Sequence, residues 1–287
     1  MECIACGGKN FSVWGRKDAY EILKCAACGL GITWPQPSTA QIGEFNRDIY
    51  SARERAAAYE VRRRELDLRH EAALVKIMKF KRSGVLLDIG CNIGVFLKAA
   101  RSAGFDVFGS EINTECATYG REKYGLDIRP GVVSAAGFNS GDFDVVTLFD
   151  VLEHVPEPFV FLKEVKRLLK SDGLLVLQAP NFDSFMAGLM RENWAWLTPP
   201  DHLYHFTPGS LLRLLKAVGF EIEEISTWEP AGDFIGNIYS DFPARSVTGR
   251  ILRKFLWFFS IFLVPFFQRL WWKAGKGGLI GIYAVKR

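Results

Sequence analysis

Histidines and, toward the end of the chain, acidic residues are scarce in this 287-residue sequence. It contains four histidines in all, and no aspartate or glutamate occurs between Phe242 and Arg287, a segment that holds nine lysines and arginines. The residues before this tail carry the other 27 of the 36 basic residues against 32 acidic ones, so their net charge is negative. Because the positive charge belongs to the tail alone, we expect the tail to meet an anionic partner. A negatively charged body argues against nucleic acid as that partner.

The tail also lacks an apolar run long enough to cross a membrane. Phe255–Phe267 comprises 13 residues without a charge, which extend about 20 Å as a helix against the ~30 Å of a bilayer core. Two hypotheses stay open. Residues 245–276 could lie on an anionic membrane as a peripheral contact, or the apolar stretch could form a lid or a homodimer surface.

Two pairs of cysteines near the start of the chain have the spacing of a metal site. The pairs are Cys-x2-Cys motifs, each followed by a glycine, and consist of Cys3, Cys6, Cys25 and Cys28. Four thiolates at this spacing predict a closed tetrahedral zinc shell of a structural zinc ribbon over residues 1–37. A redox motif would need a thioredoxin-like context and a disulfide an oxidising compartment. The first residues lack the basic segment and apolar core of a secretory signal, so we expect a cytoplasmic protein. If the tail binds a membrane, we expect the protein to lie on the inner face of that membrane as a peripheral protein. Cys91 and Cys116 are expected to be small buried side chains.

Apolar stretches and helical patterns alternate through the rest of the sequence. Strands are predicted at 85–90, 105–111, 143–150, 173–180, 220–227 and 279–286, and helices at 53–81, 95–104, before Tyr124, at 158–169 and at 208–218. This alternation predicts an α/β protein with a doubly wound, mostly parallel sheet. We therefore expect a helical connector at 38–82 and an α/β domain at 83–287, with an apolar and basic helical insertion at 230–275.

A glycine-rich turn follows the first strand of the α/β domain. Asp88 ends the strand, and the turn then reads Gly90, Cys91, Asn92, Ile93 and Gly94. In a doubly wound sheet, the first strand-to-helix turn is where ligands approach the backbone. An acid at the end of the strand favours a cationic ligand over a pyrophosphate.

Two further sequence segments support a ligand site at the glycine-rich turn. Glu111 ends the strand at 105–111, 23 positions after Asp88, and Phe149-Asp150-Val-Leu-Glu-His154 covers the end of the strand at 143–150 and the loop that follows it. Together with the turn, they resemble the cofactor motifs of class I S-adenosylmethionine-dependent methyltransferases. The resemblance implies a Rossmann-like seven-stranded sheet and a carboxylate that accepts both ribose hydroxyls. It implies a cofactor site formed by Asp88, Gly90, Cys91, Asn92, Gly94, Glu111, Ile112, Phe149 and Asp150.

Asn92 departs from the family pattern, which usually has glycine at this position. Asparagine is the residue other than glycine that best tolerates left-handed backbone angles, so the departure costs little. Its side chain could nevertheless crowd the cofactor.

The resemblance extends to the ribbon and to a loop rich in tryptophan and proline after the strand at 173–180. Chains of this kind, with an N-terminal zinc module, resemble bacterial methyltransferases of glycan and secondary metabolism. The implied activity is methyl transfer to a small-molecule, sugar or lipid-linked glycan acceptor, at a hydroxyl. The acceptor does not follow from the family name.

A hydroxyl acceptor needs a base, and a histidine has a suitable pKa. Three of the four histidines are predicted at the carboxyl ends of strands, so we expect His154, His202 and His205 at the acceptor. Alternatively, His202 and His205 only fix the loop. Two other functions stay open: an RNA methyltransferase with a zinc ribbon for recognition, and a protein that binds the cofactor without catalysis.

Overall fold

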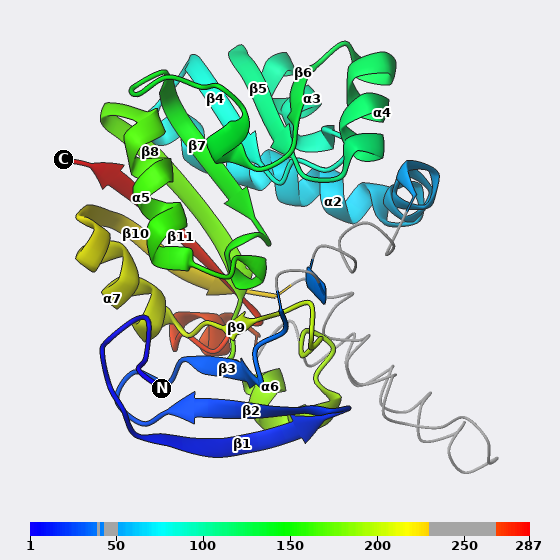
Figure 1. The fold of residues 1–287 in the computed structure, drawn as a ribbon. Helices are drawn as coiled ribbons and strands as arrows, with labels where there is room; N and C mark the ends of the chain where they lie inside the picture. The colour runs from blue at the N-terminus through cyan, green and yellow to red at the C-terminus, as the bar shows by residue number, and fades with distance from the viewer. Residues whose placement is uncertain (39–40, 43–50, 230–267) are drawn as a thin grey trace. The chain divides into compact units, whose positions relative to one another are not determined.

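The computed structural model describes residues 1–38, 41–42, 51–229 and 268–287 (Figure 1). The chain divides into two compact units. One consists of Met1–Pro37, Ala179–Leu214 and Ile225–Gly281, and the other of Ser38–Gln178, Leu215–Glu224 and Ile282–Arg287. Each unit is described below by itself. Most of the predicted insertion at 230–275 lies outside the described residues.

A seven-stranded sheet confirms the predicted fold class. In chain order its strands are β4 (Gly84–Ile89), β5 (Phe105–Glu111), β6 (Asp127–Pro130), β7 (Phe143–Phe149), β8 (Leu169–Pro180), β10 (Phe220–Trp228) and β11 (Leu279–Lys286). They lie side by side in the order β10-β11-β8-β7-β4-β5-β6, and the pairs β6–β5, β5–β4, β4–β7 and β7–β8 are parallel. The chain order reverses at β4, whose neighbours are β5 and β7. In doubly wound sheets, ligands bind at the carboxyl ends of the strands beside such a reversal.

Helices connect and cover these strands. They are α2 (Ala52–Phe80), α3 (Val95–Ser102), α4 (Thr114–Tyr124), α5 (Pro158–Leu168) and α7 (Pro208–Val218). The long helix predicted at 53–81 is confirmed as α2. It begins with a capping box, in which the Ser51 hydroxyl accepts from the backbone of Glu54 and the Glu54 carboxylate accepts from the backbone of Ser51. This reciprocal pair satisfies two N–H groups that a helix start otherwise leaves open.

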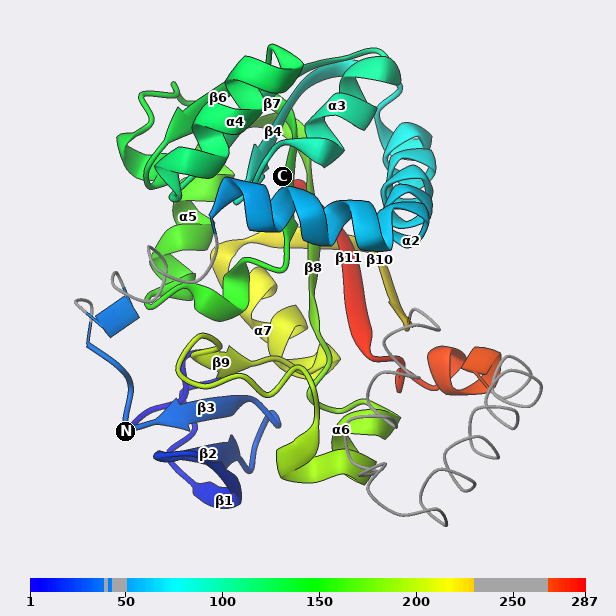
Figure 2. The same ribbon diagram turned by 90° about the vertical axis from the view of Figure 1, so that its right-hand side faces the viewer.

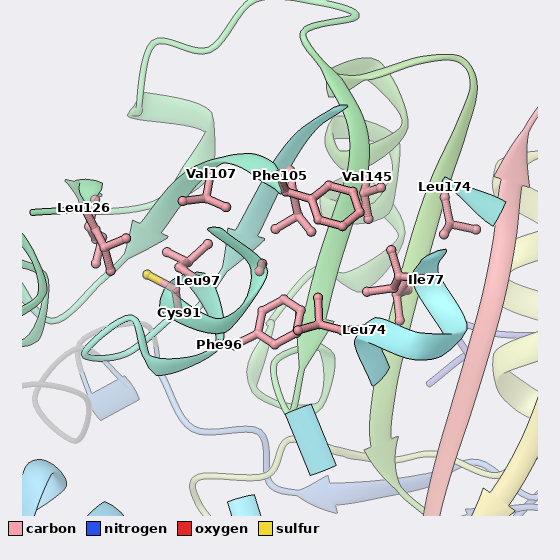
Figure 3. Close-up of a cluster of buried hydrophobic side chains, with 14 of the residues drawn as sticks. Leu74, Ile77, Cys91, Phe96, Leu97, Phe105, Val107, Leu126, Val145 and Leu174 are labelled. Atoms are coloured by element: carbon pink, nitrogen blue, oxygen red, sulfur yellow. The ribbon is translucent and has the colours of Figure 1, made fainter. Parts of the chain in front are cut away.

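Helix α2 contributes to the core of the larger unit (Figures 2 and 3). Figure 2 shows it beside α3, with which it is in contact. Leu74 and Ile77 of α2 are buried in one cluster with Phe96 and Leu97 of α3 and Val145 of β7. Each such side chain contributes about 1.5–3 kcal/mol when fully buried. Helix α2 is therefore part of the core of the larger unit.

The smaller unit contains an antiparallel sheet of β1 (Phe11–Lys17), β2 (Tyr20–Cys25), β3 (Gly31–Trp34) and the two-residue strand β9 (Tyr204–His205). An apolar cluster of this unit contains Ile22 of β2 together with Phe182 and Trp194, and Met186 of α6 (Phe185–Met190). Residues 268–273 are helical. In the part of the chain that the structure describes, no helix has the length and hydropathy needed to cross a bilayer.

Candidate active site

The turn between β4 and α3 adopts backbone angles that its glycines permit. Gly90 and Gly94 have φ of +73° and +80°. A Cβ atom at Gly90 would lie 2.6 Å from Val151 Cγ2, and one at Gly94 would lie 2.5 Å from Leu126 Cδ1. Both positions therefore require glycine for the backbone angle and for the packing.

Asn92 adopts the left-handed conformation expected for it, with φ of +53°. Its Oδ1 accepts a hydrogen bond of 2.8 Å from the N–H of Ile93, so the amide is turned back onto the backbone of its own turn. Such local bonding explains why asparagine can replace glycine here.

Glu111, at the end of β5, is buried and bonded to two backbone segments. One carboxylate oxygen accepts from the N–H of Asn92 at 2.7 Å, and the other accepts from the N–H of Asn113 at 2.8 Å. A carboxylate has about four acceptor positions, so two remain for other donors. The adjacent Ile112 is an apolar side chain with 51% of its surface exposed. An anchored carboxylate beside an exposed apolar side chain suits a nucleoside, whose ribose donates hydrogen bonds and whose base has flat faces that pack on apolar side chains.

Asp88, at the end of β4, is buried under the glycine-rich turn. Its Oδ1 accepts a 2.6 Å hydrogen bond from the Thr147 hydroxyl on β7. Burial raises the pKa of Asp88 to about 7; the nearby Glu111 charge also raises this pKa, and the Thr147 hydrogen bond opposes the rise. Asp88 is 4% exposed. Burial also raises the pKa of Cys91 well above its ordinary value, which keeps this thiol neutral. Cys91 and Cys116 are both buried, as expected.

At the end of β7, Asp150, which was predicted, pairs with Arg69, which sequence reasoning missed. Asp150 accepts from Arg69 of α2 at 2.6 Å and from the Gln178 amide at 3.1 Å, and Arg69 also donates to Gln178 at 3.2 Å. The Arg69 side chain is only 13% exposed. Phe149, one residue earlier, packs edge-to-face on Phe96 with ring centroids 4.8 Å apart. No local pattern in the charge-rich α2 distinguishes Arg69 from its neighbours.

The histidines have different environments. His154 ends a short 3-10 helix, Leu152–His154, directly after β7 in the larger unit. His202 and His205 lie in the smaller unit, with ring centroids 6.3 Å apart. The Nδ1 atom of His202 is 2.8 Å from the carbonyl oxygen of Trp196, and Nε2 of His205 is 3.1 Å from the hydroxyl of Thr33. Burial lowers the pKa of His205 to about 3, so its ring is neutral.

The four N-terminal cysteines come together, as their spacing predicts. Their sulfur atoms all lie within 4.8 Å of one another. The Sγ atoms of Cys3 and Cys28 are 3.5 Å apart, and those of Cys6 and Cys25 are 3.7 Å apart. A tetrahedral zinc with bonds of about 2.3 Å places its sulfur ligands about 3.8 Å apart, so the cluster is compatible with a zinc ribbon.

Comparisons with known proteins agree with this geometry. Residues 55–225, more than half of the chain, match the family model described as a methyltransferase domain. The chain belongs to this family, and it is a class I S-adenosylmethionine-dependent methyltransferase. The match covers the glycine-rich turn, Glu111, Asp150 and all the histidines.

The chain is also similar to individual relatives and to a solved structure. It is 28% identical over 159 residues to a ubiquinone biosynthesis O-methyltransferase of Thiobacillus denitrificans, a match that covers 50% of this chain and 68% of the relative. A protein of the same description from Cereibacter sphaeroides is 31% identical over 147 residues, covering 47% of this chain and 60% of the relative. The fold is similar to that of a S-adenosylmethionine-dependent methyltransferase from Thermotoga maritima, with a TM-score of 0.55, 17% identity, and coverage of 86% of this chain and 99% of that one.

Proposed function

We propose that this enzyme transfers the methyl group of S-adenosylmethionine to a hydroxyl oxygen of a small molecule, such as a sugar or a lipid-linked glycan. The observation that carries the proposal is the Glu111 carboxylate, which is bonded to the glycine-rich turn at Asn92 and keeps acceptor positions for ribose hydroxyls. The hydroxyl as acceptor is supported by the two relatives, both of which are named as O-methyltransferases.

The residues of the larger unit fit the cofactor. Glu111 would accept from the ribose hydroxyls, Ile112 would cover the base, and the turn with Gly90 and Gly94 would leave its backbone open to close approach. Arg69, beside Asp150, offers a cation near the carboxyl ends of β7 and β8, where the carboxylate of an amino acid moiety could bind. These assignments add Arg69 to the cofactor-binding residues predicted from the sequence.

The chemistry requires one proton acceptor from the protein. When bound, S-adenosylmethionine would supply an electrophilic methyl group to the acceptor oxygen, and the electron pair of the broken carbon–sulfur bond would stay on the sulfur, which would become a neutral thioether. The proton of the hydroxyl must go to a base, for which His154 and His202 are the candidates. His205 is a poorer candidate, because burial holds its pKa at about 3.

We propose further that Cys3, Cys6, Cys25 and Cys28 hold a structural zinc ion. The sulfur spacing supports this, and a closed shell of four cysteines leaves no open position for catalysis. Zinc would therefore stabilise the small antiparallel sheet.

Peripheral contact with an anionic membrane is a separate proposal. Residues 245–267 of the predicted segment 245–276 lie outside the described residues. In the described remainder, Arg269 and Lys273 are exposed beside Leu270, which is 59% exposed, and Leu189 of α6 is 60% exposed. Basic and apolar side chains together on a surface favour a lipid interface on the inner face of the membrane.

The acceptor class can be tested by label transfer. Methyl-deuterated S-adenosylmethionine is added to a cell lysate with the intact protein or with Glu111→Ala, and lipid, polysaccharide, RNA, protein and small-molecule fractions are separated. We expect label in the lipid, polysaccharide or small-molecule fraction only with the intact protein. Label in RNA would contradict the proposal and favour the RNA methyltransferase. Cofactor binding without label in any fraction would favour a protein that binds without catalysis.

A further inference from the structure

Gln178, near the carboxyl end of β8, joins two side chains of the candidate cofactor site in one closed set of hydrogen bonds. Its amide oxygen accepts from Arg69 at 3.2 Å, and its amide nitrogen donates to one carboxylate oxygen of Asp150 at 3.1 Å. Arg69 donates to the other carboxylate oxygen at 2.6 Å. An arginine can only donate and a carboxylate can only accept, so these partners fix which end of the Gln178 amide faces each of them. The three side chains therefore hold one another in a single arrangement.

Gln178 also holds the backbone of Asp150. The carbonyl oxygen of Gln178 accepts from the N–H of Asp150 at 3.0 Å, next to the position where Phe149 of β7 pairs with Gln178 of β8. Asp150 has φ of +56°, a left-handed conformation that residues other than glycine adopt infrequently. Such a conformation persists where the surrounding structure determines it. Because Gln178 is 6% exposed and bonds to both the N–H and the side chain of Asp150, the direction of this carboxylate depends on Gln178.

Asp150 lies next to the glycine-rich turn. The following residue, Val151, is the side chain that a Cβ atom at Gly90 would meet at 2.6 Å. The side chain of Asp150 is 26% exposed, so a ligand at the turn can reach it. Within the described part of the chain, its carboxylate accepts one side-chain hydrogen bond on each oxygen. A carboxylate has about four acceptor positions, so Asp150 keeps positions for a ligand that donates.

We propose that Gln178 is a positioning residue for the cofactor: it holds the Asp150 carboxylate where this group accepts from the ammonium of the amino-acid part of S-adenosylmethionine. The proposal rests on the proposed function, in which the larger unit binds this cofactor. A hydrogen bond between an ammonium and a carboxylate is stronger than one between neutral groups, and it weakens steeply when its geometry is poor. A carboxylate that turns away from the ammonium therefore loses most of this bond.

The test compares Gln178→Met with the wild type in calorimetric titrations. Methionine is unbranched like glutamine and forms no hydrogen bond of comparable strength with Asp150, and Gln178→Leu is a second apolar variant. Lys170→Met is the control, because Lys170 pairs with Asp144 at 2.7 Å between the same two strands, β8 and β7, at their amino ends. Three ligands separate the groups: S-adenosylhomocysteine has the ammonium and the carboxylate, its decarboxylated form has the ammonium alone, and methylthioadenosine has neither.

We expect Gln178→Met and Gln178→Leu to weaken the binding of S-adenosylhomocysteine and of its decarboxylated form about 10-fold, the effect of losing one hydrogen bond to a charged group. The affinity for methylthioadenosine should stay unchanged, which also shows that the variants are folded. Lys170→Met should bind all three ligands as the wild type does. When Asp150 is already changed to asparagine, Gln178→Met should cause no further loss, because Gln178 acts through the carboxylate.

Each of three results would overturn the proposal. Equal weakening of all three ligands by both Gln178 variants would indicate a structural role only. A loss confined to S-adenosylhomocysteine would place the ligand's carboxylate, and not its ammonium, under the control of Gln178. Wild-type affinities in both variants would show that Gln178 has no role in binding. Since no methyl transfer is measured, the affinities decide the role of Gln178 whether or not an acceptor is found, whereas label transfer decides the proposed function.

Discussion

Asp88 gives the sharpest prediction about stability, because it is an acid buried in the sheet. Its pKa is about 7 in the folded protein against an ordinary value of 3.8, chiefly through burial. A raised folded pKa means that the fold is most stable when the carboxyl is protonated, and that this contribution is lost as pH rises toward 7. The shift of about three pKa units corresponds to about 4 kcal/mol at high pH, of which about 3 kcal/mol is lost between pH 5 and pH 8.

Asp88→Asn removes this dependence, because the amide can still accept from Thr147 and does not ionise. In urea unfolding of the cofactor-free protein, followed by tryptophan fluorescence, the free energy of unfolding of Asp88→Asn relative to wild type should rise by about 3 kcal/mol from pH 5 to pH 8. Asp106→Asn is a matched control, because Asp106 lies exposed on the neighbouring strand β5. A difference between Asp88→Asn and wild type that does not change with pH would refute the reasoning.

Two further predictions concern the turn and the cysteines. In urea unfolding, Gly94→Ala should lower the free energy of unfolding by about 2–4 kcal/mol, since its Cβ would meet Leu126. Gly125→Ala, with φ of +61° and open space around it, should lower it by about 1 kcal/mol. Equal losses would contradict the packing argument. Cys25→Ser should abolish the binding of one zinc per chain in native mass spectrometry and lower the melting temperature, whereas Cys116→Ala should keep the metal. A protein purified without metal and equally stable would contradict the zinc proposal.

The sequence predicted those features that depend on local patterns. The turn from Asp88 to Gly94 is recognisable because glycines and asparagine at left-handed positions follow an apolar strand, and all of these requirements fall within a few residues. The cysteine cluster is likewise encoded in two short motifs. Alternating strands and helices predicted six of the seven strands, whereas the four-residue strand β6 carried no pattern of its own, and the count of seven came from the family resemblance.

The side-chain hydrogen bonds of the candidate site residues could not be predicted, because they join residues far apart in the chain. Thr33 and His205 are 172 positions apart, and Arg69 and Asp150 are 81 apart. No sequence pattern distinguishes a threonine in a short strand or an arginine in a charged helix, because only the fold brings their partners next to them. The scarcity of histidines singled them out in the sequence, but the groups that contact each ring, such as the Thr33 hydroxyl at His205, depend on the fold.

The central claim is that Glu111 binds the cofactor, and calorimetric titration with S-adenosylhomocysteine tests it most directly. Both carboxylate oxygens of Glu111 accept backbone N–H groups, and Glu111→Gln replaces one of them by an amide nitrogen, which cannot accept a hydrogen bond. Glu115→Gln is the control, because it changes an exposed acid in the first turn of α4. We predict that Glu111→Gln weakens binding about 10- to 100-fold, the effect of losing about 1.5–3 kcal/mol, and that Glu115→Gln binds as the wild type does. Equal affinity of Glu111→Gln and wild type, or no binding by the wild type, would contradict the claim.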